Sequence, residues 1–345
     1  MKAVRIHHHG GVEELRVDEI PVPSIQPREV LLEVKSTGLN HLDLWVRRGI
    51  PGLKLPLPLV LGSDASGVIH KVGSEVKRWN PGDRVMVVPG YGCGQCPECR
   101  SGRENYCAKY SIGGEHGNGV QAEFLALDEE RLISMPPNIS FEDAAAIPLV
   151  FQTAWEMLVN KAKIQPGETA LIWGASSGVG SAAVQIAAML GARVITIAGG
   201  AEKVEKAKQL APKLDVIDYQ ARDVSREIKT LTAGRGVDVV IDHVGEATFE
   251  KSLRAMNIGG RLVFCGATTG PAVKFDLRYV FFKQQSILGS TMGNRGDLAK
   301  IGSLVGQGKL HAVVDRVFEV EAIRNAHEYL ESGRQFGKVV VRFAK

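Results

Sequence analysis

The sequence contains no run of about 18 apolar residues, the length that a membrane-spanning helix requires. Its first residues, MKAVRIHHHGG, contain no apolar stretch of the kind found in a secretion signal. It also has no internal repeat and no basic stripe with interleaved aromatic residues. These absences disfavour membrane proteins, secreted proteins and nucleic-acid-binding proteins. We expect a cytoplasmic protein that acts on a small molecule.

Cysteine is scarce outside one glycine-rich loop, GYGCGQCPECRSGRENYC. The loop holds Cys93, Cys96, Cys99 and Cys107 in the spacing C-x2-C-x2-C-x7-C. Four thiolates this close can bind one tetrahedral Zn²⁺, and they leave no open position for a substrate. The pattern therefore predicts one structural zinc ion per subunit.

Three other interpretations of this loop are weaker. A bacterial ferredoxin cluster would have three residues and a following Pro at the last spacing. Disulfides suit secreted chains, and four unrelated buried thiols rarely cluster in this way. A zinc ion with four thiolates would lower the formal net charge of +4 by two, so charge gives no argument for a nucleic-acid partner.

Two halves of the chain differ in their hydrophobic pattern. Its 345 residues are enough for about two domains. Residues 1–150 contain short β-rich segments, such as 29–38 and 82–88, separated by Gly and Pro turns. This half is predicted to be a mostly β domain, with the cysteine loop at about residues 90–110.

Residues 151–289 alternate apolar strands with helices, beginning with a strand at 169–174 and a helix at 178–190. Continuous apolar strands with intervening helices predict a parallel sheet covered on both faces, the doubly wound α/β domain that binds dinucleotides. The segments after residue 290 have no place in that sheet. We therefore expect residues 290–345 to return to the first domain.

The first turn from strand to helix has the sequence GASSGVG. A dinucleotide pyrophosphate binds at such a turn, where the free N–H groups of the helix N-terminus attract an anion. Small side chains permit close backbone approach, although Ala175 and Ser177 replace the first two glycines of G-x-G-x-x-G. The predicted cofactor-binding residues of this turn are Gly174, Ser176, Ser177, Gly178, Val179 and Gly180.

The end of the second strand bears on the choice between NAD and NADP. An NAD-dependent enzyme places Asp or Glu there, whereas this chain has Gly199 and Gly200, followed by Lys203. Tyr219, after the third strand, is predicted to lie beside the adenine ribose. This pattern favours NADP(H). The alternative is that Lys203 is a solvated helix residue, and Glu202 is a nearby acid that argues the other way.

Several motifs together resemble the zinc-containing medium-chain dehydrogenase/reductase superfamily over essentially the whole length. They are the cysteine loop, GLNHLDLWVRRG, LVLGSDASGVIHKVGSEVKRWNPGDRV and the strand–helix half. The resemblance implies a GroES-like catalytic domain followed by a Rossmann domain. Alcohol dehydrogenases of this superfamily bind a second, catalytic zinc through motifs like C-H-T-D-L and G-H-E.

This chain departs from the superfamily at the positions of the catalytic zinc ligands. Asn40 and Ser63 stand where the family has Cys and His, and the third thiolate position falls near Leu149 or Val150. Leu42 replaces the Thr that relays the alcohol proton. Residues 38–43 are instead similar to the pattern G-L-N-x-x-D of the quinone oxidoreductase branch. Most members of that branch lack the cysteine loop.

Loss of these ligands favours a reaction that needs no Lewis acid. Reduction of a quinone or enone requires only that the acceptor is positioned and its developing oxygen charge stabilised. We predict that Asn40 donates an amide N–H to that oxygen, with Ser63 and Asp64 lining the same pocket. The alternative role for Asn40 is to satisfy backbone groups at a strand end.

The resemblance implies further cofactor contacts. His41 is expected near the pyrophosphate and Thr153 near the nicotinamide. Segments that follow later strands are expected to edge the nicotinamide pocket: His243, Val244, Gly245, Gly266, Ala267, Ser290 and Thr291.

Three functions remain open. The first is an NADPH-dependent quinone or enone reductase, which includes enoyl thioesters as acceptors. The second is an alcohol dehydrogenase with an altered metal set that uses Asp64 and His41. The third is a non-catalytic NADPH-binding protein. We also expect a homodimer or homotetramer joined through the last strand of the sheet, residues 286–292.

Overall fold

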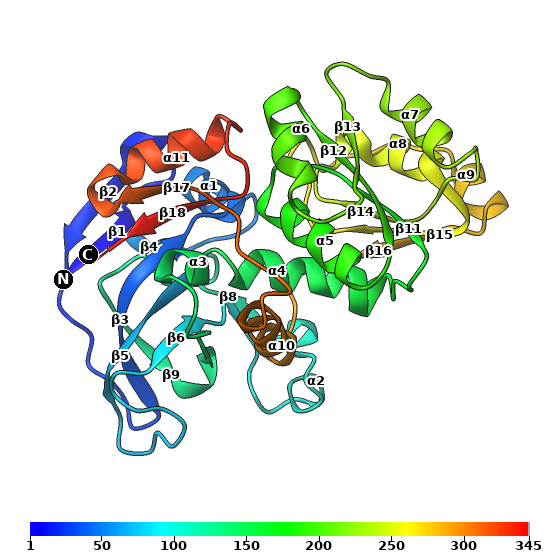
Figure 1. The fold of residues 1–345 in the computed structure, drawn as a ribbon. Coiled ribbons are helices and arrows are strands. Elements are labelled where there is room, and N and C mark those ends of the chain that lie inside the picture. Colours follow the sequence, from blue (N-terminus) through cyan, green and yellow to red (C-terminus); the bar gives the residue numbers. More distant parts are fainter. Residues whose placement is uncertain (344–345) are drawn as a thin grey trace. The chain divides into compact units, whose positions relative to one another are not determined.

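The computed structural model describes residues 1–343 and divides the chain into two compact units. Unit 1 comprises Met1–Gln152 and Gly293–Lys345, and unit 2 comprises Thr153–Met292. The chain thus leaves unit 1 once and returns to it, as the colours in Figure 1 show. Each unit has its own buried apolar cluster.

Unit 1 is built around a largely antiparallel sheet in the order β10-β6-β5-β3-β18-β17, with β9 also paired to β3. Strand β3, which the sequence predicts over residues 29–38, has those bounds. The strands are β3 (Glu29–Gly38), β5 (Asp64–Val72), β6 (Arg84–Val87), β9 (Phe124–Asp128), β10 (Leu132–Ser134), β17 (Val314–Glu319) and β18 (Lys338–Arg342).

Two smaller sheets complete unit 1. One has the order β2-β1-β4 and the other pairs β7 with β8. Their strands are β1 (Lys2–Ile6), β2 (Leu15–Glu19), β4 (Leu59–Val60), β7 (Gly90–Tyr91) and β8 (Ser111–Ile112). The helices of unit 1 are α1 (His41–Arg48), α2 (Pro97–Arg100), α3 (Phe141–Ala145), α10 (Arg295–Gly306) and α11 (Ile323–Glu331), with α4 (Pro148–Trp155) running across the boundary.

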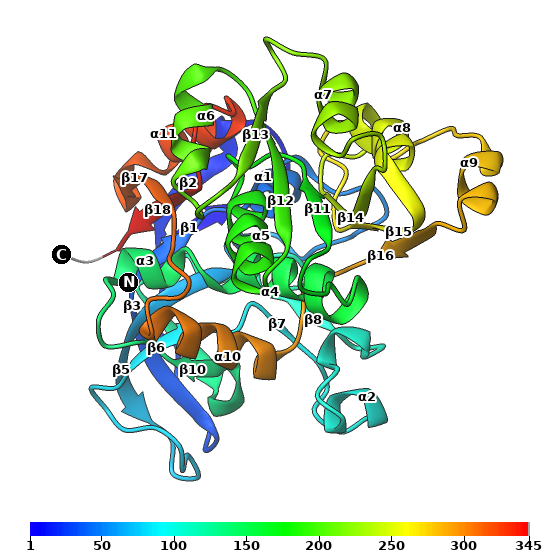
Figure 2. The ribbon, with the colours of Figure 1, turned by 45° about the vertical axis from the view of Figure 1, so that its right-hand side comes forward.

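Unit 2 contains six parallel strands in the order β13-β12-β11-β14-β15-β16. Helices α5 and α6 cover one face of this sheet, and α7 and α8 cover the other (Figures 1 and 2). The doubly wound parallel sheet that the sequence predicts for this part of the chain is confirmed. The strands are β11 (Thr169–Ile172), β12 (Arg193–Ala198), β13 (Asp215–Asp218), β14 (Val237–Asp242), β15 (Met256–Phe264) and β16 (Ser286–Gly289). The helices are α5 (Gly178–Met189), α6 (Ala201–Lys208), α7 (Val224–Leu231), α8 (Glu246–Ala255) and α9 (Leu277–Phe282), preceded by a π-helical turn at Glu156–Lys161.

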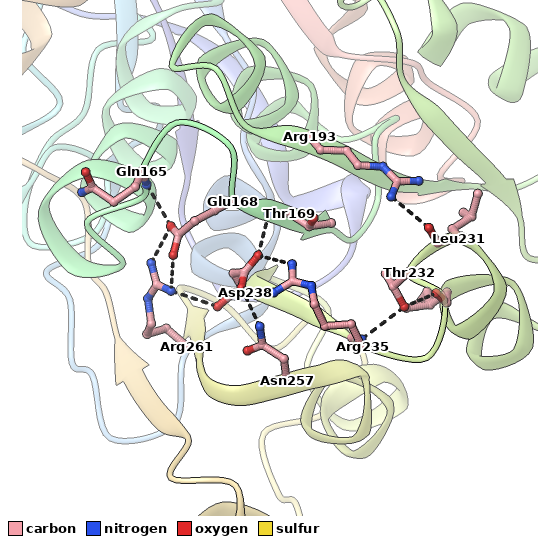
Figure 3. Close-up of polar contacts among 12 residues, drawn as sticks. Gln165, Glu168, Thr169, Arg193, Leu231, Thr232, Arg235, Asp238, Asn257 and Arg261 are labelled. Carbon is pink, nitrogen blue, oxygen red and sulfur yellow. Dashed lines mark hydrogen bonds and ion pairs between the residues drawn. The ribbon is translucent and has the colours of Figure 1, made fainter.

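Ion pairs join the strands of unit 2 near their amino ends (Figure 3). Arg261 forms two 2.8 Å bonds to the carboxylate of Glu168. Asp238 accepts from Arg235, Asn257 and the backbone N–H of Thr169. Burial acts to raise the pKa of Asp238, but these bonds outweigh it and bring the pKa to about 2. The predicted cofactor turn lies at the opposite edge, where the strands end.

Within residues 1–343, no helix combines the length and the apolar character needed to cross a membrane.

Candidate functional site

The four cysteines of the loop converge on one point in unit 1. The Sγ atoms of Cys93, Cys96, Cys99 and Cys107 all lie within 4.8 Å of one another. Glycine makes this convergence possible, because a Cβ at Gly92 would lie 2.5 Å from the sulfur of Cys99. We call this group the four-cysteine lobe.

Backbone N–H groups point at the sulfur atoms of the lobe. Cys107 Sγ accepts from Cys93 N at 3.4 Å and from Lys109 N at 3.3 Å, and Cys93 Sγ accepts from Cys96 N at 3.4 Å. Backbone N–H groups of Gln95 and Cys96 are the main cause that lowers the pKa of Cys93 to about 6. Such donors favour thiolates, and four thiolates fit a tetrahedral zinc ion. The lobe is therefore a structural zinc site with a complete ligand set.

A second polar cluster lies in unit 1, where β3, β5 and β18 are neighbours. The ammonium of Lys338 donates to Asn40 Oδ1 at 2.6 Å and to Asp64 Oδ2 at 3.0 Å. The amide of Asn40 in turn donates to Asp64 Oδ2 at 2.9 Å. The exposed fractions of Asn40, Asp64 and Lys338 are 6%, 0% and 4%, so the three groups satisfy one another away from solvent.

Two further groups complete this cluster, and we call its four side chains the Asn40 site (Asn40, Asp43, Asp64 and Lys338). The backbone N–H of Leu149 donates to Asp64 Oδ1 at 2.8 Å. Asp43 lies in the first turn of α1 and accepts from the backbone N–H of Asn40 at 2.7 Å. Burial raises the pKa of Asp43 to about 7. The bond from Asn40 and the charge of Lys338 act to lower this pKa, but burial outweighs them.

Ser63 and His41 flank the cluster without joining its hydrogen bonds. The hydroxyl of Ser63 is buried and donates to the carbonyl oxygen of Gly113 at 2.8 Å. His41 is the first residue of α1, and burial, followed by the charges of Lys338 and Arg48, lowers its pKa. Its imidazole is therefore neutral near pH 7. The predicted roles of Asn40, Ser63, Asp64 and His41 toward substrate and cofactor remain predictions.

The Asn40 site does not fit a catalytic zinc ion. Zinc prefers thiolate and imidazole ligands, and the two ligand positions of the resembling family hold the amide of Asn40 and the hydroxyl of Ser63 in this chain. The carboxylate of Asp64 already bonds an ammonium, an amide and a backbone N–H. A metal ion here would have to displace the buried charge of Lys338, so the site is complete without one.

The predicted cofactor turn lies at the carboxyl end of β11. Ser177 caps α5 and accepts from the backbone N–H of Gly180 at 2.8 Å, and its Oγ lies 2.8 Å from His243 Nε2. A Cβ at Gly180 would lie 2.0 Å from the carbonyl oxygen of Gly174, so only glycine fits there. Gly174 itself has φ +65°, a left-handed conformation that favours glycine. Between these glycines lie Ser176, Gly178 and Val179, all half-buried.

The end of β12 forms a corner with the end of β13. The ring of Tyr219 lies directly over Gly199, where an added Cβ would come within 2.6 Å of it. Asp218 also enters this corner and accepts from the backbone N–H of Gly200 at 3.0 Å. Lys203 lies one turn farther along, in α6. A carboxylate is thus present near the end of the second strand, although it comes from the third.

The remaining predicted cofactor residues follow later strands of the same parallel sheet. Val244 and Gly245 follow β14 and donate to the carboxylate of Asp242 at 2.8 and 3.2 Å. A Cβ at Gly245 would lie 2.8 Å from Ala267, so these two turns touch. Gly266 follows β15, and Ser290 and Thr291 follow β16. Thr153, by contrast, is buried within α4.

Sequence reasoning missed two residues of these sites. Lys338 begins the apolar strand KVVVR, where a charged first residue normally lies in solvent. The signal that could have identified it is a lysine between Gly337 and three valines in a central strand. Asp218 lies within a strand by its sequence pattern, and only the pairing of β13 with β12 brings it beside Gly200.

Comparison with known proteins gives two matching family models. The model described as alcohol dehydrogenase GroES-like domain matches residues 26–137, and the model described as zinc-binding dehydrogenase matches residues 178–307. The two matched ranges fall in unit 1 and mainly in unit 2, respectively.

Individual relatives cover almost the whole chain. An acryloyl-coenzyme A reductase of Metallosphaera sedula is 32% identical, with 99% of each chain covered. An NAD-dependent alcohol dehydrogenase of Sulfolobus acidocaldarius is 33% identical, also with 99% of each chain covered. A crystal structure of an NAD-dependent alcohol dehydrogenase superposes with a TM-score of 0.96 at 45% identity, over 100% of both chains.

Proposed function

Because this chain belongs to the family of zinc-binding dehydrogenases with a GroES-like domain, we propose that it is an NADPH-dependent reductase that works without a catalytic metal. Its acceptors are α,β-unsaturated carbonyls, including enoyl thioesters, or quinones. The observation that carries the proposal is the closed hydrogen-bond network of Asn40, Asp64 and Lys338.

The proposed reaction moves a hydride and a proton. The turn at residues 174–180 would hold NADPH, which would supply a hydride to the β carbon of the acceptor. The π electrons of the acceptor then move onto its carbonyl oxygen, which becomes an enolate, and water supplies the proton that adds to the α carbon. Since the acceptor is already electrophilic, the protein needs to hold it and to stabilise the enolate oxygen.

Asn40 is the proposed donor to that oxygen. One of its amide N–H groups is held by Asp64 at 2.9 Å. The other is 3.4 Å from the carbonyl oxygen of Gly38, at the outer limit of a hydrogen bond. This loosely held N–H is the one that an acceptor oxygen would recruit, because the bond given up is weak.

The choice of NADPH rests on the corner beside Gly199. No side chain of β12 places a carboxylate there, and the carboxylate of Asp218 is engaged by the backbone N–H groups of Gly200 and Gln220. These bonds lower the pKa of Asp218. Lys203 and Tyr219 are the groups proposed to meet the 2′-phosphate.

The relatives point to two different classes of substrate. The acryloyl-coenzyme A reductase supports an enoyl thioester. The alcohol dehydrogenases support a second candidate, an alcohol dehydrogenase in which Asp64 binds a metal ion. That candidate requires Lys338 to leave Asp64, and we consider it the alternative to be tested.

Steady-state oxidation of NADPH, followed by absorbance, tests the proposal. The acceptors are an enoyl thioester, a simple enone and a quinone, and the comparison reaction is the oxidation of ethanol and benzyl alcohol with and without added Zn²⁺. We expect turnover with at least one acceptor and negligible alcohol oxidation in either condition.

Two results would contradict the proposal. Alcohol oxidation that rises with added zinc and disappears in Asp64→Asn would favour the altered-ligand dehydrogenase. Cofactor binding without turnover of any acceptor or alcohol would favour the third function, a non-catalytic NADPH-binding protein.

We also propose that the chain forms a homodimer through β16. This strand is the last of the unit 2 sheet and pairs only with β15 among the described residues. Beside it in sequence, α9 exposes Leu277, Phe281 and Phe282 by 59% or more. An open strand edge next to exposed aromatic side chains favours pairing about a twofold axis. Light scattering at micromolar concentration should give a dimer or tetramer, and a monomer would contradict this.

A further inference from the structure

We infer that Lys338 is a positioning residue for the reaction and that it acts through the side chain of Asn40. The inference rests on the proposed function, because it concerns the donor of that reaction. Neither the proposed role of Asn40 nor the family resemblance of the sequence points to Lys338. It follows from the three contacts that close the Asn40 site.

Two contacts fix the orientation of the Asn40 amide. An ammonium only donates hydrogen bonds, and an ionised carboxylate only accepts them. Lys338 therefore requires the oxygen of the Asn40 amide on its side, at 2.6 Å, and Asp64 requires the nitrogen at 2.9 Å. The amide has one allowed orientation, and in that orientation its second N–H points to the loosely held contact with Gly38.

The ammonium of Lys338 also strengthens the amide N–H groups of Asn40 as hydrogen-bond donors. A charged donor bonded to an amide oxygen withdraws electron density from the amide and makes its N–H groups better donors. The effect is large only where solvent does not screen the charge. Lys338 has an exposed fraction of 4% and Asn40 of 6%, so the ammonium polarises the amide with little screening.

The charges around Lys338 are consistent with this role. Asp64 bonds the ammonium directly, Asp43 lies in the first turn of α1, and the neutral imidazole of His41 begins that helix. Two of the three N–H groups of Lys338 have partners in the described structure. Within residues 1–343, Asp64 is the carboxylate that bonds Lys338, so the ammonium is held on Asn40 and Asp64.

A double-mutant cycle on kcat tests the inference with the full-length protein and NADPH. The variants are Lys338→Met, Asn40→Ala and the two combined, measured with whichever acceptor the parent protein reduces. If Lys338 acts through Asn40, Lys338→Met alone should lower kcat by roughly tenfold with a smaller change in KM. In the Asn40→Ala protein the same change should have little further effect.

Removal of Lys338 alone leaves Asp64 as an unpaired buried carboxylate, and the variant is at risk of misfolding. The cycle is therefore repeated in an Asp64→Asn background, where position 64 is neutral and still offers an oxygen to Asn40. Lys338→Arg should recover part of the lost kcat, because it restores a charged donor. The matched control is Lys300→Met, which breaks an ion pair of the same 3.0 Å length in α10 of unit 1.

The outcomes separate the inference from the proposed function. Losses in kcat that multiply in the combined variant, in both backgrounds, would show that Lys338 and Asn40 act independently and would overturn the inference alone. A Lys338→Met protein with parental kcat would do the same. A parent protein that reduces no acceptor would overturn both the proposed function and the inference.

Discussion

Two polar clusters of unit 1, the four-cysteine lobe and the Asn40 site, gather donor atoms in opposite ways. In the lobe, four sulfur atoms lie within 4.8 Å of one another, and those of Cys93 and Cys107 accept hydrogen bonds from backbone N–H groups. In the Asn40 site, a carboxylate, an amide and an ammonium satisfy one another. Four thiolates in one cluster need a cation from outside the chain, whereas a cluster that contains an ammonium has its own cation.

The two clusters should also respond oppositely to pH. Zinc binding requires deprotonated thiolates, so the lobe loses stability as pH falls. The raised pKa of Asp43 means that the Asn40 site holds a proton in the folded state that the unfolded chain releases, so its contribution falls as pH rises.

The largest effect should follow the loss of one zinc ligand. Cys99→Ser leaves three thiolates, and structural zinc sites contribute on the order of 10 kcal/mol to folding at pH 7. We expect loss of most of the zinc and a marked fall in Tm, measured by mass spectrometry of the metal and by calorimetry. The fraction that folds should keep its turnover per molecule.

The control for this prediction is Cys265→Ser. Cys265 lies outside the lobe, and burial raises its pKa to about 12, so this thiol should not contribute to zinc binding. A folded Cys99→Ser protein without turnover would show that the lobe is more than structural.

The second effect concerns Asp43. Its pKa rises from an ordinary 3.8 to about 7 on folding. Between these values the folded protein binds one more proton than the unfolded chain, so the free energy of unfolding falls by about 1.4 kcal/mol per pH unit. Asp43→Asn removes this slope. Relative to the parent, the variant should gain about 3 kcal/mol between pH 5 and pH 8, measured by urea unfolding.

Asp83→Asn is the matched control for that slope. Asp83 accepts from the backbone N–H of Asn80 at 2.8 Å, the same bond that Asp43 accepts from Asn40 at 2.7 Å, but in an exposed turn. The difference between the slopes of the two variants isolates the contribution of burial at Asp43. Equal slopes for the two variants would mean that burial does not set the protonation of Asp43.

The third effect concerns catalysis at the Asn40 site. Asn40→Ala removes the proposed donor to the enolate oxygen and should lower kcat by roughly 10- to 100-fold, somewhat less than a fixed oxyanion donor gives in a dry site. Its zinc content should stay that of the parent. Asn138→Ala, which removes an exposed amide in the same unit, serves as the control. An unchanged kcat for Asn40→Ala would assign the residue to structure alone.

The smallest effect should come from an exposed charge in unit 2. Lys203→Ala should weaken NADPH binding by about fivefold and leave NADH binding nearly unchanged, because a partly exposed pair with phosphate contributes about 1 kcal/mol. Titration of both cofactors by fluorescence measures this. Tighter NADH binding in the parent protein would show that Asp218 governs the corner and that the cofactor is NAD.

Local sequence patterns predicted most of the fold. The β-rich composition of residues 29–38, between Gly and Pro turns, predicted the bounds of β3, and the Gly-rich turn with its following helix located Ser177 and Gly180. The cysteine spacing predicted the lobe because its ligands lie within 15 residues of one another. Interactions between residues that are close in sequence can be predicted from local patterns.

The Asn40 site could be predicted only in part. The replacement of zinc ligands was evident at Asn40 and Ser63, but the cation that bonds Asn40 and Asp64 was not. Lys338 lies 298 residues from Asn40, and it reaches that residue because β18 pairs with β3. A long-range pairing of this kind gives no local pattern, and a lysine in an apolar strand is read as a surface residue.

The most direct test of the account is the zinc content of protein that is actively reducing an acceptor. We predict one zinc ion per subunit, bound by the four-cysteine lobe, together with full turnover of an enone, enoyl thioester or quinone. Two zinc ions per subunit, with activity that is lost when the second is removed, would contradict the account and place a metal ion in the Asn40 site.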